Sequence, residues 1–98
     1  MKATRMNHLE WSPWHEHDFA PDHFSFLHHW REATHPSYHR AEVWQFRKNG
    51  RTQYEAYVQA GPYGETGYLR KIFNRAKDAR LAVEMAVQAA LAAGDMTI

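Results

Sequence analysis

The residues from Val43 to Ala93 constrain the fold more than any other part of this 98-residue chain. Two strand-like segments flank Asn49-Gly50, a dipeptide typical of tight hairpin turns. A glycine-rich loop over residues 61–67, a third strand-like segment and a long alanine-rich segment follow. This order predicts an α+β fold, with a three-stranded antiparallel sheet over residues 41–73 and a C-terminal helix over residues 75–93 packed on one sheet face.

The alanine-rich segment has the clearest periodicity. Small apolar residues recur in it at helical spacing, which predicts a narrow face that lies close to the sheet. These residues are Ala79, Ala82, Val83, Ala86, Val87, Ala90 and Leu91. Asn74 is a candidate N-cap, and Gly94 follows the expected end of the helix. Leu81 and Met85 fall outside this face, so we expect them to cover the N-terminal arm or to form an exposed contact patch.

Two registers compete for the hairpin. A two-residue loop pairs Trp44 with Glu55, whereas a three-residue loop with Gly50 in the left-handed region pairs Trp44 with Tyr54. We predict the three-residue loop, because it collects large apolar residues on one face and burial selects the register. That face would pack against the C-terminal helix and would hold Trp44, Phe46, Tyr54, Ala56 and Val58. The other face would hold Gln45, Arg47, Arg51, Gln53, Glu55 and Gln59.

The sequence predicts an irregular arm followed by a helix in the N-terminal part of the chain. Residues 1–20 predict an irregular arm, because Pro13 restricts the backbone around it. Disordered arms seldom carry two tryptophans, so we expect Trp11 and Trp14 to dock this arm on the core. Residues 22–34 predict a helix, because apolar residues recur there at helical spacing between two prolines.

The composition excludes several classes of protein. The chain has no cysteine, which excludes disulfides, thiolate metal sites and a cysteine nucleophile. Its length fits a single domain over residues 1–98. No run approaches the roughly 18 apolar residues of a membrane span, so we expect a cytoplasmic protein without membrane contact. No phosphate-binding loop, dinucleotide fingerprint or catalytic triad can be assembled, so we do not expect an enzyme.

Charge and histidine are unevenly distributed. Residues 40–80 hold nine Lys or Arg against four Asp or Glu, so this part is the one expected to meet an acidic partner. All eight histidines lie in residues 1–39. His15 and His17 have the spacing of some metal ligands, but Phe19 and Ala20 occupy positions where metallo-hydrolases carry Asp and His. We therefore expect no metal or other cofactor, and keep a small His-dependent metal-binding protein or enzyme as one alternative.

The segment from Val43 to Leu91 resembles two kinds of small module. The features concerned are Trp44, Asn49-Gly50, the run from Tyr54 to Val58, Phe73 and Asp78-Ala79. They are similar to the AP2-like domains at the N-terminus of phage-type integrases, which implies DNA reading by the sheet. They also resemble short phage-encoded hairpin-plus-helix proteins of the CRISPR-inhibitor type, which implies inhibition of a host complex.

These patterns support two hypotheses about the function of the chain. The first is a non-enzymatic binding protein of phage or mobile-element type that inhibits a host protein or nucleoprotein complex by occupying its surface. The second is a nucleic-acid-binding module that uses the basic hairpin. Trp, Tyr and Arg are favoured anchors at such surfaces, and cations contact phosphates. The candidate partner-binding residues are Trp11, Trp14, Arg47, Lys48, Arg51, Tyr57, Tyr63 and Arg70.

Overall fold

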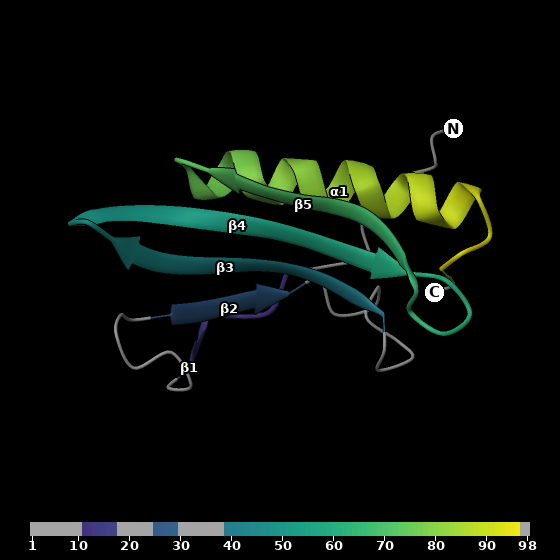
Figure 1. Ribbon diagram of the computed structural model, residues 1–98, viewed down its shortest axis with the longest axis horizontal. Helices are drawn as coiled ribbons and strands as arrows, with labels where there is room; N and C mark the ends of the chain where they lie inside the picture. Colours follow the sequence, from purple (N-terminus) through teal and green to yellow (C-terminus); the bar gives the residue numbers. More distant parts are fainter. Residues whose placement is uncertain (1–10, 18–24, 30–38, 97–98) are drawn as a thin grey trace.

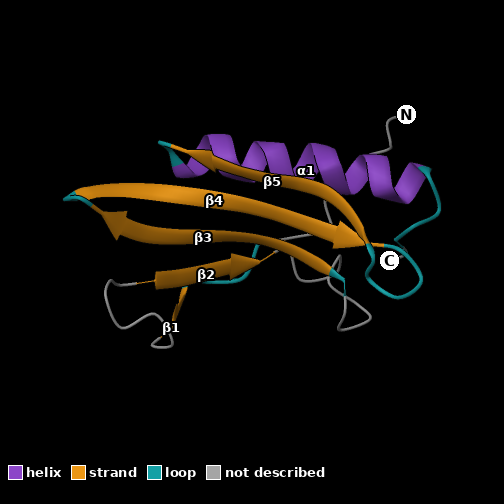
Figure 2. Ribbon diagram, viewed as in Figure 1, coloured by secondary structure: helices purple, strands orange, loops and turns teal. Residues whose placement is uncertain are grey.

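The structure is a computed structural model that describes residues 11–17, 25–29 and 39–96. In this part of the chain five strands form one antiparallel sheet in sequence order, and one helix packs on it (Figure 1). The elements are β1 (His15–His17), β2 (Ser25–His29), β3 (Arg40–Lys48), β4 (Arg51–Ala60), β5 (Thr66–Phe73) and α1 (Ala76–Ala92). Helix α1 lies along β3, β4 and β5 on one face, and β5 borders the sheet (Figure 2). The predicted α+β unit of three strands and a C-terminal helix is confirmed in β3, β4, β5 and α1, whereas β1 and β2 extend the predicted three-stranded sheet to five strands.

The predicted N-terminal helix over residues 22–34 is wrong in the part that the structure describes. Ser25–His29 form β2, which pairs antiparallel with β3, and the rest of the range lies outside the described residues. A run of five residues is too short for periodicity to separate strand from helix, and the pairing partner is distant in sequence. Residues 15–17 form β1, so the predicted irregular arm also contributes a short strand.

The β3–β4 turn has a two-residue loop, so the predicted three-residue loop is also wrong. Lys48 pairs with Arg51, and both loop residues are left-handed, with φ of 55° at Asn49 and 77° at Gly50. Two consecutive left-handed residues are typical of a type I′ turn, whose twist matches that of the flanking strands. The conformational preference of Asn49-Gly50 for this turn therefore outweighs the tendency to collect large apolar residues on one face of the hairpin.

The register moves side chains between faces, because a shift of one residue inverts every position of a strand. Trp44 and Phe46 share a side of β3 with Glu42 and point away from α1, not toward it as predicted. Ala41 and Val43 take the predicted aromatic places beneath α1 and are fully buried there. The predicted polar face is divided in the same way, with Gln45 and Arg47 on the α1 side of β3 and the polar residues of β4 on the opposite side.

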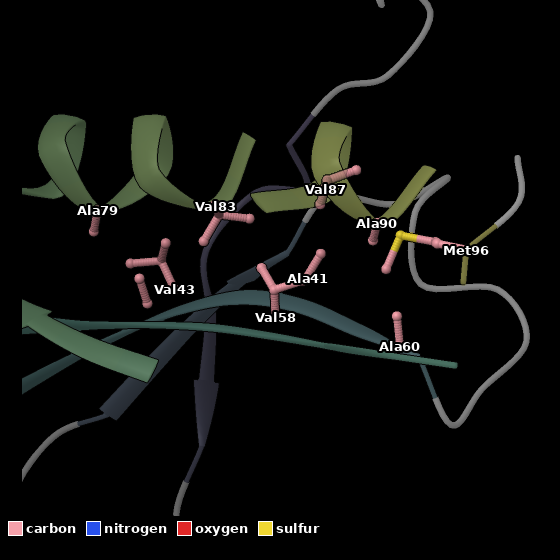
Figure 3. Packing of buried hydrophobic residues seen from close by; sticks show 10 residues of the cluster. Ala41, Val43, Val58, Ala60, Ala79, Val83, Val87, Ala90 and Met96 are labelled. Carbon is pink, nitrogen blue, oxygen red and sulfur yellow. The ribbon is translucent and has the colours of Figure 1, made fainter. Parts of the chain in front are cut away.

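The core between α1 and the sheet is made of small residues (Figure 3). Its buried members are Ala41, Val43, Ala56, Val58, Ala60, Ala79, Val83, Val87, Ala90 and Met96. The predicted helix face is confirmed, since its buried positions project from α1 toward β3 and β4. Leu69 and Phe73 of β5 pack against this core from its edge. Leu81 and Met85 lie on the outer side of α1, with 56% and 63% of their surface exposed.

The segment before β1 docks on the same core. Trp11 and Trp14 pack against it half-buried, which confirms the predicted docking of the arm. The Trp11 indole Nε1 donates a hydrogen bond to Glu84 Oε2 on α1 at 3.0 Å. The rings of Trp14 and Tyr54 lie 6.4 Å apart, which ties the segment to β4 as well.

Helix α1 begins one residue later than predicted. Its N-cap is Arg75, not Asn74, and no side chain caps it, while the Arg75 Nε donates to Asp78 Oδ2 at 3.2 Å. Its end is as predicted, because Gly94 follows with a left-handed φ of 80°. The described part of the chain contains no helix with the length and apolar character needed to cross a membrane.

The replacement Gly50→Ala tests the turn. Nothing lies within 4 Å of a Cβ at this position, so the expected loss, about 1 kcal/mol, comes from the left-handed backbone alone. Urea denaturation measures the loss. Gly67→Ala is the matched control, because space is equally free there and the backbone is not left-handed, so we expect a change within about 0.5 kcal/mol. Equal losses for the two variants would contradict the type I′ turn.

Candidate nucleic-acid interface

Three separate segments that carry cations lie at one end of the molecule. The β3–β4 turn, the last residues of β5 and the first turn of α1 all lie at this end in Figure 1. We call it the cationic end, and its members are Arg47, Lys48, Arg51, Lys71, Arg75 and Lys77. The Lys71 ammonium reaches over the Phe73 ring, 5.5 Å from its centre, and so extends toward the same end. Asp78, which pairs with Arg75, is an acidic residue beside these cations.

The tip of the hairpin joins two like charges. Lys48 and Arg51 are direct cross-strand partners, both are exposed, and neither forms an ion pair within the described part of the chain. Like charges in directly opposite positions destabilise a strand pair. Arg47, which precedes Lys48 on β3, donates to the Gly50 carbonyl oxygen at 3.1 Å, and this bond holds its guanidinium over the turn. The tip therefore presents positive charge that no carboxylate of the described ranges neutralises.

The sheet also presents a polar and aromatic surface on the side away from α1. We call this surface of β3, β4 and β5 the distal face, and its members are Arg40, Glu42, Trp44, Phe46, Gln53, Glu55, Tyr57, Gln59, Arg70 and Ile72. The carboxylate of Glu42 organises the β3 side. Its Oε1 accepts hydrogen bonds from Arg40 Nη2 at 2.8 Å and from Trp44 Nε1 at 3.0 Å. The hydrogen bond that Arg40 donates to Glu42 raises the pKa of Arg40, so this guanidinium is a permanent cation.

Tyr57 lies at the centre of the distal face between two guanidinium groups. The Cζ atom of Arg40 is 4.3 Å from the centre of the Tyr57 ring, and that of Arg70 is 5.8 Å from it. Both distances are within the range of cation–π attraction. Glu55, next to Tyr57 on this face, accepts from Arg70 Nε at 3.1 Å. The arrangement places planar cations on an aromatic ring across three strands.

The structure separates the sequence-predicted contact residues into groups. Arg47, Lys48 and Arg51 lie at the cationic end, whereas Tyr57 and Arg70 are neighbours on the distal face. Tyr63 is 86% exposed in the loop between β4 and β5, at the other end of the sheet. Trp11 and Trp14 belong to neither surface, because they pack against the core.

Sequence reasoning missed Arg40 as a contact residue. Its guanidinium reaches Tyr57 only because Arg40 pairs with Gln59 in the two-residue-loop register. The signal was present in the spacing of two residues between Arg40, Glu42 and Trp44, which puts them on one face of a strand. The wrong register would have placed this row beneath α1.

The metal alternative depends on the histidine-rich third of the chain. His15 and His17 belong to β1, and three of the other six histidines lie outside the described residues. Within the described ranges, no three His, Asp or Glu side chains are grouped as metal ligands would be. His39 is buried, and its Nε2 lies 2.8 Å from the Gly61 carbonyl oxygen, so it joins the start of β3 to the loop after β4.

The cationic end and the distal face are thus two adjoining surfaces. The first is rich in positive charge, and the second combines an aromatic ring with guanidinium groups. No family model, curated protein or solved structure matches this chain.

Proposed function

We propose that this chain is a non-enzymatic protein that binds nucleic acid by its phosphates, with the cationic end as the contact surface. The observation that carries the proposal is the like-charged pair of Lys48 and Arg51 at the hairpin tip. Their mutual repulsion destabilises the free protein and is relieved when an anion lies between them. Cations near the start of α1 extend the same positive field, which suits a partner with regularly repeated negative charge.

The test is the salt dependence of binding. A fluorescently labelled oligonucleotide of random sequence is titrated with protein, and anisotropy gives the affinity at several salt concentrations between about 50 and 200 mM. If four to six cations contact phosphates, the logarithm of the association constant should fall against the logarithm of the salt concentration with a slope of about −3 to −5. No detectable binding at low salt, or a slope near zero, would remove the proposal.

A second candidate function is supported by other residues. Tyr63, Leu81 and Met85 are exposed apolar side chains away from the hairpin tip, and phosphate binding does not require them. They fit the phage-type inhibitor that occupies a host protein or nucleoprotein complex. This candidate gains if a host complex stays bound to the chain after nuclease treatment at high salt and loses its activity when the purified chain is added.

A further inference from the structure

The Arg40–Tyr57–Arg70 group has a geometry that phosphate binding alone does not need. Arg40 is held against the Tyr57 ring by its bonds to Glu42, and about 38% of its side chain is exposed. Arg70 is held by a single bond from its Nε to Glu55, and 74% of its side chain is exposed. Arg40 is therefore held through its Nε and Nη2, whereas Arg70 is held through its Nε alone and offers both terminal nitrogens to a ligand.

A shallow recess of about 320 Å³ lies beside this group. Tyr57, Gln59, Gly67 and Arg70 contribute to its lining, at the point where a bulge after Val58 interrupts the pairing of β4 with β5. Gly67 brings no side chain to the recess, so its backbone forms that part of the border. The Gln59 amide is fixed, because its Oε1 accepts from the Tyr57 hydroxyl at 2.8 Å and its Nε2 donates to the Gly64 carbonyl oxygen.

The size and chemistry of the recess fit one planar ring. Its volume is at the lower end of the roughly 300–1,000 Å³ of small-molecule sites, and its surface is mainly apolar. Aromatic side chains and guanidinium planes are the groups on which proteins stack unpaired bases. Tyr57 and Arg51 are six residues apart on β4, about 20 Å along the strand, so a short nucleic-acid strand can reach from the recess to the hairpin tip.

We propose that the recess beside Tyr57 and Arg70 takes an unpaired nucleobase, and that the protein therefore prefers single-stranded to double-stranded nucleic acid. The inference rests on the proposed function, because the cationic end supplies the phosphate contacts that bring the strand to the distal face. A base within a duplex is stacked on its neighbours and paired, so it reaches such a surface only after it is extruded. The phosphate contacts are open to both kinds of strand, and the base contact discriminates between them.

The experiment compares three labelled probes of equal length: a thymidine oligonucleotide, the same backbone with abasic sites, and a duplex. The wild-type chain should bind the thymidine oligonucleotide more tightly than the abasic one by about five- to a hundredfold. The variant Tyr57→Leu keeps an apolar side chain and removes the ring, so it should bind the two equally. Tyr57→Phe keeps the ring and should retain the preference.

The possible results separate this inference from the proposed function. If the thymidine and abasic probes bind equally and with salt dependence, the base contact is overturned and the phosphate contacts remain. Tighter binding of the duplex than of the thymidine probe has the same meaning. Failure to bind any probe overturns both. If Tyr57→Leu does not fold, Arg70→Ala replaces it, because that side chain is mostly exposed and its loss should reduce the same preference. An unchanged preference in a folded Arg70→Ala variant counts against the recess.

Discussion

The variant Val83→Asp is expected to be unfolded at room temperature. Val83 is completely buried between α1 and the sheet, among alanine and valine side chains that offer no partner to a carboxylate. Burial of an unpaired charge costs several kcal/mol, whereas a domain of this length has a total stability of about 5–15 kcal/mol. Far-ultraviolet circular dichroism and a thermal melt measure the loss of the fold.

Leu81→Asp is the matched control for Val83→Asp. The two positions lie on the same helix and receive the same side chain, so the intrinsic helix penalty of Asp, about 0.5 kcal/mol, is shared. Leu81 is 56% exposed, and the introduced carboxylate stays hydrated there. We expect this variant to fold and to lose less than about 1 kcal/mol. Similar melts for the two variants would mean that α1 does not pack on the sheet through its Val83 side.

Neutralisation of the hairpin tip by the double variant Lys48→Gln, Arg51→Gln should weaken nucleic-acid binding by about a hundredfold at roughly 50 mM salt. Each lost phosphate contact removes the release of about one counterion. At this salt concentration that release contributes about a factor of ten to the association constant. The salt slope should fall by about 1.4–1.8. Stability should stay the same or rise by a few tenths of a kcal/mol, since the variant also removes the repulsion between cross-strand partners.

The control for the double variant carries the same change in net charge elsewhere. Gln88→Glu with Ala89→Glu lowers the charge by the same amount on exposed positions of α1, away from the hairpin tip. Anisotropy should give an affinity close to that of the wild-type chain for this control. If the two double variants weaken binding equally, the effect comes from net charge, and the cationic end is not a contact surface.

The secondary structure of the C-terminal half could be predicted, because its signals are local. Residues that recur every three or four positions fix the buried side of α1 around Val83 and Val87, and Gly94 marks its end. The strands flank a turn dipeptide whose conformational preference is strong. Residues 25–29 carried no such signal, since their strand conformation depends on pairing with β3, which lies beyond a separate stretch of chain.

The hairpin register could not be predicted from the preference for burying the largest apolar side chains. Each side of β3 carries an apolar pair that could be buried. One side has Trp44 and Phe46, and the other has Ala41 and Val43. The structure places the small pair under α1, because an alanine- and valine-lined helix can approach a sheet closely only over small side chains. This choice also brings Arg40 beside Tyr57, so the missed contact residue and the wrong register have one cause.

The position of Arg70 and Lys71 in β5 has a consequence for self-association. In the described sheet β5 is a border strand, whose outer backbone groups would accept another strand. Two molecules that met antiparallel along this border would bring their adjacent cations together, and the repulsion opposes growth of the sheet from one copy to the next. The positive charge of β5 thus opposes polymerisation through this border. The repulsion is strongest at low ionic strength, where screening is weakest.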